Sequence, residues 1–210
     1  MAKPTIIINL KTYKQGASVL KLCKVIESVD KNIIIGAQAE DISTLSKKTK
    51  LKIYAQHSDY QEPGRNTGFI LPEGLKARGA KGVFLNHSEH RIDFKIIKKT
   101  VKACRDEKLK VAIFAKNLKQ AKKLKKLKPD FLIIEPPELV AGKISVSKAK
   151  PDLIKTVAKK LKAPFLIGAG IKTSGDLKIA IKLGASGIAL SSAITKAKNP
   201  KKKLKELLEK

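Results

Sequence analysis

Short apolar runs alternate with amphipathic segments along the chain, and this alternation constrains the fold more than any other feature. The runs are apolar on both faces, as is typical of strands buried in a parallel sheet. The eight expected strands are residues 5–10, 33–38, 51–56, 82–86, 111–115, 131–135, 164–168 and 187–190. Parallel strands require crossover connections, so segments between the runs are expected to contain helices.

The segments between the runs show helical periodicity. One apolar stripe joins Val19, Leu22, Cys23 and Ile26, and comparable stripes recur in later segments with lysines on the opposite side. These patterns predict amphipathic helices that cover a sheet. Because the composition does not change along the chain, we expect residues 1–210 to form one α/β domain, a (β/α)₈ barrel.

The net charge of +28 raises the possibility of a nucleic-acid-binding protein. Several features disfavour this alternative. The basic residues number 46, of which only four are arginine, and aromatic residues make up 4% of the chain. Base readout favours arginine and single-strand binding favours aromatic platforms, so a lysine-rich solvated surface is the preferred interpretation. The charge would also steer an anionic substrate inward.

The two cysteines, Cys23 and Cys104, lie far apart and form no metal-binding spacing. They are expected to be buried structural thiols in a reducing compartment. No secretory leader and no apolar run long enough to span a membrane is visible in the sequence. These observations favour a cytoplasmic protein without membrane contact.

A carboxylate follows one of the expected buried strands. Glu135 ends the run 131–135 and is followed at once by Pro136 and Pro137. The carboxyl ends of barrel strands form the face where chemistry is done, and the two prolines predict a rigid base for a loop that could close as a lid. Glu135 is therefore a candidate general base, whose basicity we expect to rise under the lid. The alternative is a structural carboxylate paired with a lysine.

A histidine follows another expected strand. His87 comes directly after the run 82–86 and before Ser88, which is expected to cap the helix that contains Phe94. The positive end of that helix would keep the imidazole neutral and able to polarise a carbonyl group. A buried structural histidine is the alternative. His57 and His90 lack this placement and are expected in loops or at the surface.

The first and last strands offer further candidates. Asn9 and Lys11 stand at the end of the first strand and are expected to face the same mouth, although any single lysine among so many is weak evidence. Glycine-rich residues 168–173 and the serine-rich residues 191–193 follow strands seven and eight. Barrels frequently bind phosphate at that position through backbone N–H groups.

Several motifs occur together in a specific order. They are Asn9-Leu-Lys11, Gln56-His57, Glu62-Pro-Gly64, Thr67-Gly68, Asn86-His-Ser-Glu89, Glu135-Pro-Pro-Glu-Leu139, Val146-Ser-Lys-Ala-Lys-Pro151 and Gly168-Ala-Gly-Ile171. With these motifs the chain resembles the triosephosphate isomerase family, in its short archaeal form, over nearly the full length.

The resemblance implies interconversion of dihydroxyacetone phosphate and D-glyceraldehyde 3-phosphate through an enediol. It implies that Glu135 is the base, His87 the neutral electrophile and Lys11 the cation that stabilises the enediolate. The substrate-binding residues implied are Asn9, Leu10, Lys11, Val140, Gly170, Ser191 and Ser192. No metal or organic cofactor is implied. Thr67 matches a position that reaches across a subunit interface, which implies a homodimer or homotetramer.

Two segments depart from the family pattern. The lid reads Val140-Ala-Gly-Lys143 where the family carries Ile-Gly-Thr-Gly, and Ala115 replaces a cysteine at the end of the fifth strand. The first change bears on lid closure and the second on packing. The nearest alternative is another phosphate-binding barrel isomerase, which would not need His87, Glu135 and Lys11 together. A nucleic-acid binder would be distinguished by a steep loss of affinity with salt.

Overall fold

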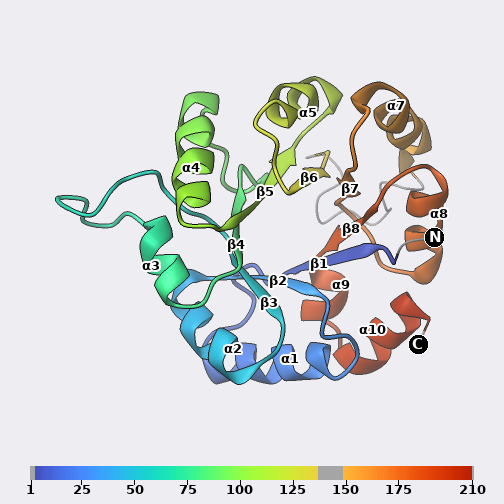
Figure 1. Cartoon of the computed structure of the whole chain (residues 1–210). Coiled ribbons are helices and arrows are strands. Elements are labelled where there is room, and N and C mark those ends of the chain that lie inside the picture. Colours follow the sequence, from blue (N-terminus) through green and yellow to red (C-terminus); the bar gives the residue numbers. More distant parts are fainter. Residues whose placement is uncertain (1–2, 137–148, 210) are drawn as a thin grey trace.

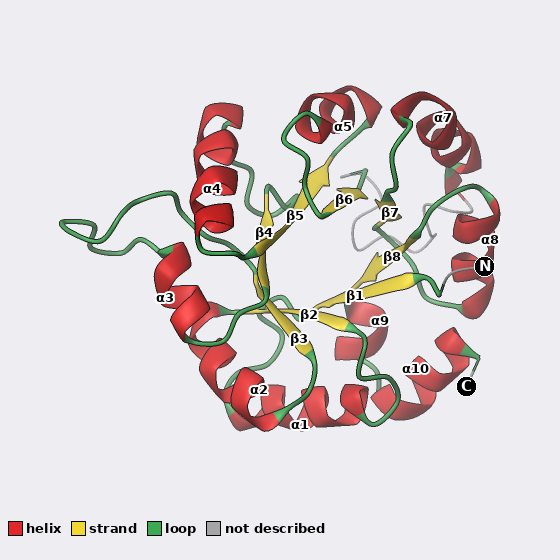
Figure 2. Ribbon diagram, in the orientation of Figure 1, coloured by secondary structure: helices red, strands yellow, loops and turns green. Residues whose placement is uncertain are grey.

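The computed structural model of the chain describes residues 3–136 and 149–209. These residues form a closed barrel of eight parallel strands in the order of the sequence, with β1 pairing with β8 to close it. Figures 1 and 2 show the strands at the centre and the helices around them. The expected α/β barrel is confirmed.

The strands agree closely with the apolar runs. Their bounds are β1 Thr5–Asn9, β2 Ile34–Ala37, β3 Lys52–Ala55, β4 Gly82–Leu85, β5 Lys110–Ala115, β6 Phe131–Ile134, β7 Leu166–Ile167 and β8 Gly187–Leu190. Each strand lies within its expected run except β5, which begins one residue earlier. A strand buried on both faces must be apolar throughout, which is why the runs located the strands so well.

The helices also follow the expected pattern. Their bounds are α1 Ala17–Glu27, α2 Ile42–Lys48, α3 Pro72–Ala77, α4 Phe94–Asp106, α5 Leu118–Lys125, α7 Pro151–Leu161, α8 Ser174–Lys182, α9 Ser192–Thr195 and α10 Pro200–Leu208, with a 3₁₀ turn at Ala39–Asp41. In α5 the exposed Lys122 and Lys123 lie opposite the buried Ala121 and Leu124. These lysines therefore lie on the outer face of an amphipathic helix, as expected.

The expected start of α4 is wrong. Ser88 does not cap this helix, which begins at Phe94 and is capped by Asp93, whose carboxylate accepts a hydrogen bond of 2.7 Å from the Lys95 N–H. His87 instead belongs to a loop between β4 and α4. Its chemistry therefore does not depend on the dipole of α4, because that effect is confined to the first turn.

Aromatic rings fill the interior of the barrel. Tyr54, Phe84 and Phe114 are almost fully buried there, and the rings of Phe84 and Phe114 pack edge to face with centroids 5.5 Å apart. Gly36 on β2 makes room for them, since a Cβ at this position would lie 2.1 Å from the ring of Phe84. A side chain at residue 36 therefore cannot be accommodated without displacing the ring.

A second apolar layer lies between the strands and the helices. It includes Cys23 on α1 and Cys104 on α4, both fully buried and free. Burial, aided by the charges of Asp41 and Glu27, raises the pKa of Cys23 to about 12. Burial also raises the pKa of Cys104 to about 12. Such thiols are unreactive, in agreement with a packing role.

The helices built by the described residues are all too short or too polar to cross a membrane. The extended segment between β3 and α3 reaches outward beyond the ring of helices (Figures 1 and 2). Phe69 in this segment exposes 48% of its surface. Among the large apolar residues in the described part of the chain, Phe69 has the largest exposed fraction.

Replacing Gly36 tests the packing of the barrel interior. We expect Gly36→Ala to lower the free energy of unfolding by about 1–3 kcal/mol, because the added methyl group overpacks the space beside Phe84. Chemical denaturation measures this change. Gly74→Ala in α3 is the matched control, since its Cβ would meet nothing within 4 Å and should be neutral or slightly stabilising. Equal stability of the two variants would contradict the packing model.

Candidate active site

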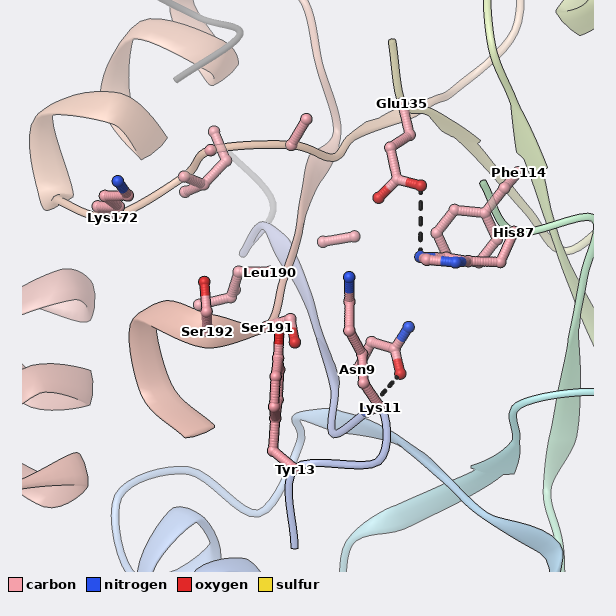
Figure 3. Close-up of a pocket in the computed structure, with 14 residues that line it drawn as sticks. Asn9, Lys11, Tyr13, His87, Phe114, Glu135, Lys172, Leu190, Ser191 and Ser192 are labelled. Atoms are coloured by element: carbon pink, nitrogen blue, oxygen red, sulfur yellow. Dashed lines mark hydrogen bonds and ion pairs between the residues drawn. The ribbon is translucent and has the colours of Figure 1, made fainter. Parts of the chain in front are cut away.

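A pocket opens where the carboxyl ends of the strands meet (Figure 3). The residues that line it come from the ends of β1, β4, β5, β6, β7 and β8. They are Asn9, Lys11, Tyr13, His87, Phe114, Glu135, Ala169, Gly170, Ile171, Lys172, Ala189, Leu190, Ser191 and Ser192. The structure therefore brings together most of the site residues expected from the sequence.

Two expected site residues are not part of this lining. The Leu10 side chain is 5% exposed and packs in the apolar layer between the strands and the helices. A contact between the Leu10 side chain and a substrate in the pocket is therefore not supported. Val140 and the lid departure at residues 140–143 lie outside the described residues.

The Glu135 carboxylate and the His87 imidazole face each other across the pocket. Glu135 follows β6 directly, and its backbone N–H donates to the Ala115 carbonyl at 2.8 Å, which continues the sheet. Its side-chain Oε2 lies 3.3 Å from His87 Nε2 and accepts a hydrogen bond of 2.9 Å from Ser88 Oγ. Figure 3 marks this contact between the Glu135 carboxylate and the His87 imidazole.

The environment of His87 defines which ring nitrogen carries a proton. The Glu89 backbone N–H donates to His87 Nδ1 at 3.2 Å. A nitrogen that accepts such a bond holds a lone pair, so the proton of the neutral ring resides on Nε2, the atom that faces Glu135. The ring packs edge-on against Phe114 with centroids 4.8 Å apart. His87 Nδ1 is therefore bound by a backbone N–H of its own loop and not by a helix terminus.

The pKa of Glu135 reflects opposing influences. Burial alone would raise it, but hydrogen bonding to His87, hydrogen bonding to Ser88 and the charge of Lys11 together hold the pKa of Glu135 below its usual range. The sequence led us to expect that Glu135 becomes more basic when the lid covers it. In the described structure the shift has the opposite direction, because the hydrogen bonds stabilise the ionised form.

Lys11 is held in position by its own backbone and by three polar neighbours, Asn9, Gln56 and Glu89. It adopts a left-handed conformation with φ of 50°, and its N–H donates to Asn9 Oδ1 at 3.0 Å. Gln56 Nε2 donates to the Lys11 carbonyl at 3.0 Å and to Asn9 Oδ1 at 3.2 Å. The Lys11 ammonium pairs with Glu89 Oε1 at 2.5 Å. The expected convergence of Asn9 and Lys11 on one mouth is therefore present.

The loops after β7 and β8 form the opposite wall. Ala169 and Gly170 adopt positive φ values of 81° and 69°. Asp176 anchors the β7 loop, since its Oδ2 accepts hydrogen bonds of 3.0 Å from the N–H groups of both Lys172 and Thr173. The described lining residues of this wall include Lys172, Ser191 and Ser192 but no carboxylate, which suits an anionic group.

Sequence reasoning did not assign site roles to Gln56, Ser88 and Glu89, although all three contact the candidate residues. Gln56 could have been found, because it follows β3 directly, just as Glu135 follows β6. His57 and His90 lie in loops outside the pocket lining, with their ring centroids 4.4 Å apart and their planes tilted by 55°. No group of three or more potential metal ligands occurs in residues 3–136 and 149–209.

The barrel, the carboxylate–imidazole pair and the anion-compatible wall define a class of enzyme: a barrel isomerase that moves protons on a small anionic substrate. Comparison with known proteins makes this specific. The family model "Triosephosphate isomerase" matches residues 4–209. The chain belongs to the triosephosphate isomerase family, the aldose–ketose isomerases that interconvert dihydroxyacetone phosphate and D-glyceraldehyde 3-phosphate, and the expected family is confirmed.

Archaeal relatives are of similar length. The triosephosphate isomerase of Methanothermus fervidus is 37% identical, and the match covers 99% of each chain. That of Sulfurisphaera tokodaii is 40% identical, with 99% of this chain and 95% of the relative covered. A crystal structure of triosephosphate isomerase from Bartonella henselae superimposes with a TM-score of 0.72 at 19% identity, over 92% of this chain and 94% of that one. This structural likeness shows the shared fold.

Gly168 on the β7 loop tests the placement of Glu135. A Cβ at residue 168 would lie 3.2 Å from Glu135 Oε1, closer than most side-chain contacts. We expect Gly168→Ala to displace the carboxylate and lower kcat by about tenfold, since a misplaced catalytic group loses rate steeply. Steady-state kinetics with glyceraldehyde 3-phosphate measures this. Gly175→Ala, whose Cβ would meet only Thr173 Oγ1 at 3.6 Å, is the control and should retain kcat. Equal kcat in both variants would refute the steric role.

Proposed function

We propose that this chain interconverts dihydroxyacetone phosphate and D-glyceraldehyde 3-phosphate, with Glu135 as the base and His87 as the electrophile. One observation carries these roles: Glu135 Oε2 lies 3.3 Å from His87 Nε2 in a pocket that also contains the Lys11 ammonium. A carbon acid next to a carbonyl group needs a base for its proton and a donor for its oxygen. The pair supplies both.

The reaction proceeds by two proton transfers to and from carbon. Glu135 removes a proton from the carbon next to the carbonyl group, while His87 Nε2–H donates a hydrogen bond to the carbonyl oxygen. The electron pair of the broken C–H bond forms the double bond of an enediolate. Lys11 stabilises the negative charge that develops on oxygen. Return of the proton from Glu135 to the neighbouring carbon, with transfer of a proton between the two oxygens, completes the isomerisation without net oxidation.

Substrate binding must also change the state of Glu135. In the described structure its carboxylate accepts hydrogen bonds from Ser88 and His87, which lower its pKa. A substrate carbonyl that takes the His87 Nε2–H removes one of these bonds. Burial then dominates and raises the pKa of Glu135 toward that of an effective base. The carboxylate thus gains basicity when the substrate is in place.

We further propose that the phosphate group binds the wall formed after β7 and β8. The backbone N–H groups of Gly170, Ser191 and Ser192 are the candidate donors, supported by their place in the pocket lining. Asn9 would assist Lys11 on the opposite side. Val140 keeps its expected role as a lid residue as part of this proposal, and lies outside the described residues.

The Glu135→Gln variant tests the base. The amide keeps the size and hydrogen-bonding capacity of the side chain but cannot take the proton, so kcat should fall by at least ~10²–10⁴. KM for glyceraldehyde 3-phosphate should change much less, because the phosphate wall is intact. Coupled steady-state assays measure both constants. Glu73→Gln, an exposed carboxylate in the first turn of α3, is the control. Near wild-type kcat in Glu135→Gln would rule out this base.

We also propose that the protein is a homodimer or homotetramer. The segment between β3 and α3 extends away from the barrel, and it carries the exposed Thr67 and the 48% exposed Phe69. An apolar ring on a projecting loop is better accommodated in a subunit interface than in water. The free, buried Cys23 and Cys104 support a reducing location such as the cytoplasm.

A variant at Phe69 tests the interface. Phe69→Ser should lower the mass measured by light scattering after size exclusion, because it removes the largest apolar group of the loop. Phe69→Tyr retains the ring and is expected to keep the assembly. If the wild-type protein is already a monomer, or if Phe69→Ser leaves its mass unchanged, this loop is not the interface.

A further inference from the structure

We propose that Asn86 is a positioning residue for the isomerisation, whose side chain holds the loop of residues 86–92 so that His87, Ser88 and Glu89 meet Glu135 and Lys11. This inference rests on the proposed function, because it concerns the geometry of the same reacting groups. It assigns a role to a residue that touches neither the substrate pocket nor the carboxylate. The hydrogen bonds of Asn86 and the contacts of the loop carry it.

The backbone of Asn86 turns the chain at the end of β4. Its φ is 60°, in the left-handed region, and the residue is 1% exposed. Most side chains disfavour this conformation, whereas glycine adopts it freely and asparagine tolerates it. The turn directs the next residue, His87, into the pocket instead of continuing the strand. The position therefore needs a residue that accepts a positive φ.

The side chain of Asn86 adds a link that glycine could not provide. Its Nδ2 donates to the Phe114 carbonyl on β5 at 2.8 Å, and this bond is buried. Phe114 is also the residue whose ring packs edge-on against His87 with centroids 4.8 Å apart (Figure 3). The Asn86 amide and the His87 imidazole thus both contact Phe114 on the neighbouring strand. A shift of Asn86 relative to β5 would move His87 as well.

Asn86 also closes the loop on itself. Its Oδ1 accepts the Ile92 N–H at 3.3 Å, and its backbone carbonyl accepts Arg91 Nη1 at 2.6 Å. Within the loop, the His90 N–H donates to the His87 carbonyl at 3.0 Å. Both ends of the loop are therefore tied to one buried residue, which limits the conformations available to the residues between them.

Three contacts of the reacting groups come from that closed loop. His87 Nε2 and Ser88 Oγ lie 3.3 and 2.9 Å from Glu135 Oε2, and Glu89 pairs with Lys11 at 2.5 Å. Rates of reaction depend steeply on such placement, so loss of the tether should act on kcat. The phosphate wall belongs to other loops, after β7 and β8, and does not touch Asn86.

The Asn86→Gly variant separates the backbone from the side chain. Glycine permits the φ of 60° but lacks both side-chain hydrogen bonds. We expect kcat to fall by about tenfold or more, while KM for glyceraldehyde 3-phosphate stays within about threefold, as for loss of a transition-state interaction. A kcat within twofold of wild type in a folded Asn86→Gly protein would overturn the inference.

The pH profile provides a readout that a purely structural role would not change. The groups that face Glu135 among the described residues are His87, Ser88, Lys11 and Arg91. When the loop loosens, Glu135 loses hydrogen bonds that favour its ionised form, so its pKa rises. The acid limb of kcat/KM, which reports the free enzyme, should move to higher pH. An unshifted limb together with reduced kcat would overturn the inference.

Two further variants complete the experiment. Asn199→Ala removes a comparable amide that caps α10 by accepting the Lys202 N–H at 3.0 Å, far in the chain from the loop. Asn199→Ala should lower the unfolding temperature but leave kcat and the acid limb of kcat/KM unchanged. If Asn199→Ala lost as much kcat as Asn86→Gly, reduced stability alone would explain the loss of activity, and the inference would be overturned. Asn86→Ala also removes both side-chain hydrogen bonds and adds no charge. It serves if Asn86→Gly does not fold, with the same expected shifts and the same refuting outcomes.

The failure of this inference is distinguishable from failure of the proposed function. If the wild-type protein does not isomerise glyceraldehyde 3-phosphate, the proposed function fails and the inference with it. If the wild-type protein is active and Glu135→Gln is inactive, but Asn86→Gly keeps its kcat, only the positioning role is wrong.

Discussion

The pairing of the first strand with the last is the constraint on which the rest of the structure depends. Ile7 is opposite Ala189 and Thr5 is opposite Gly187 in this parallel pair. A Cβ at Gly187 would lie 2.1 Å from the Thr5 carbonyl oxygen, so the close approach of the two strands requires glycine there. Because the sheet is closed, the carboxyl ends of all its strands surround one mouth, and residues far apart in the chain can share a pocket.

The hydrogen bonds of Glu135 stabilise its buried carboxylate and also affect its basicity. Ser88 and His87 both contact its Oε2, which offsets part of the cost of burying a charge. The same hydrogen bonds make it a weaker base. In the mechanism we propose, the substrate exchanges protein donors for substrate contacts, so the basicity of Glu135 would depend on occupancy of the pocket.

The fold could be predicted from the sequence in almost every element, because buried parallel strands must be apolar and covering helices must be amphipathic. The position of Asn9, His87 and Glu135 at one pocket was also expected, because each stands at or just beyond the end of a strand. The start of α4 was not, since Ser88 and Asp93 are both good capping residues and only the tertiary contact of Ser88 with Glu135 decides between them. Local sequence does not encode such a contact.

Other features were beyond sequence reasoning for related reasons. The Leu10 side chain points into the apolar layer because the strand pleat reverses at each residue, although its neighbours face the pocket. The surroundings of His87 were also predicted wrongly: the Glu89 backbone N–H contacts Nδ1 where the terminus of the next helix was expected. A loop hydrogen bond of this kind depends on backbone angles that residue types specify only weakly.

The order in which the pocket residues occur along the chain has a consequence for synthesis. Asn9 and Lys11 lie just after β1, whereas Ser191 and Ser192 lie just after β8. During translation the first of these residues emerges long before the last, and the pairing of β1 with β8 has one of the largest sequence separations in the fold. Contacts of such separation form slowly. A nascent chain therefore acquires no complete pocket until its eighth strand has left the ribosome, and activity appears only at the end of folding.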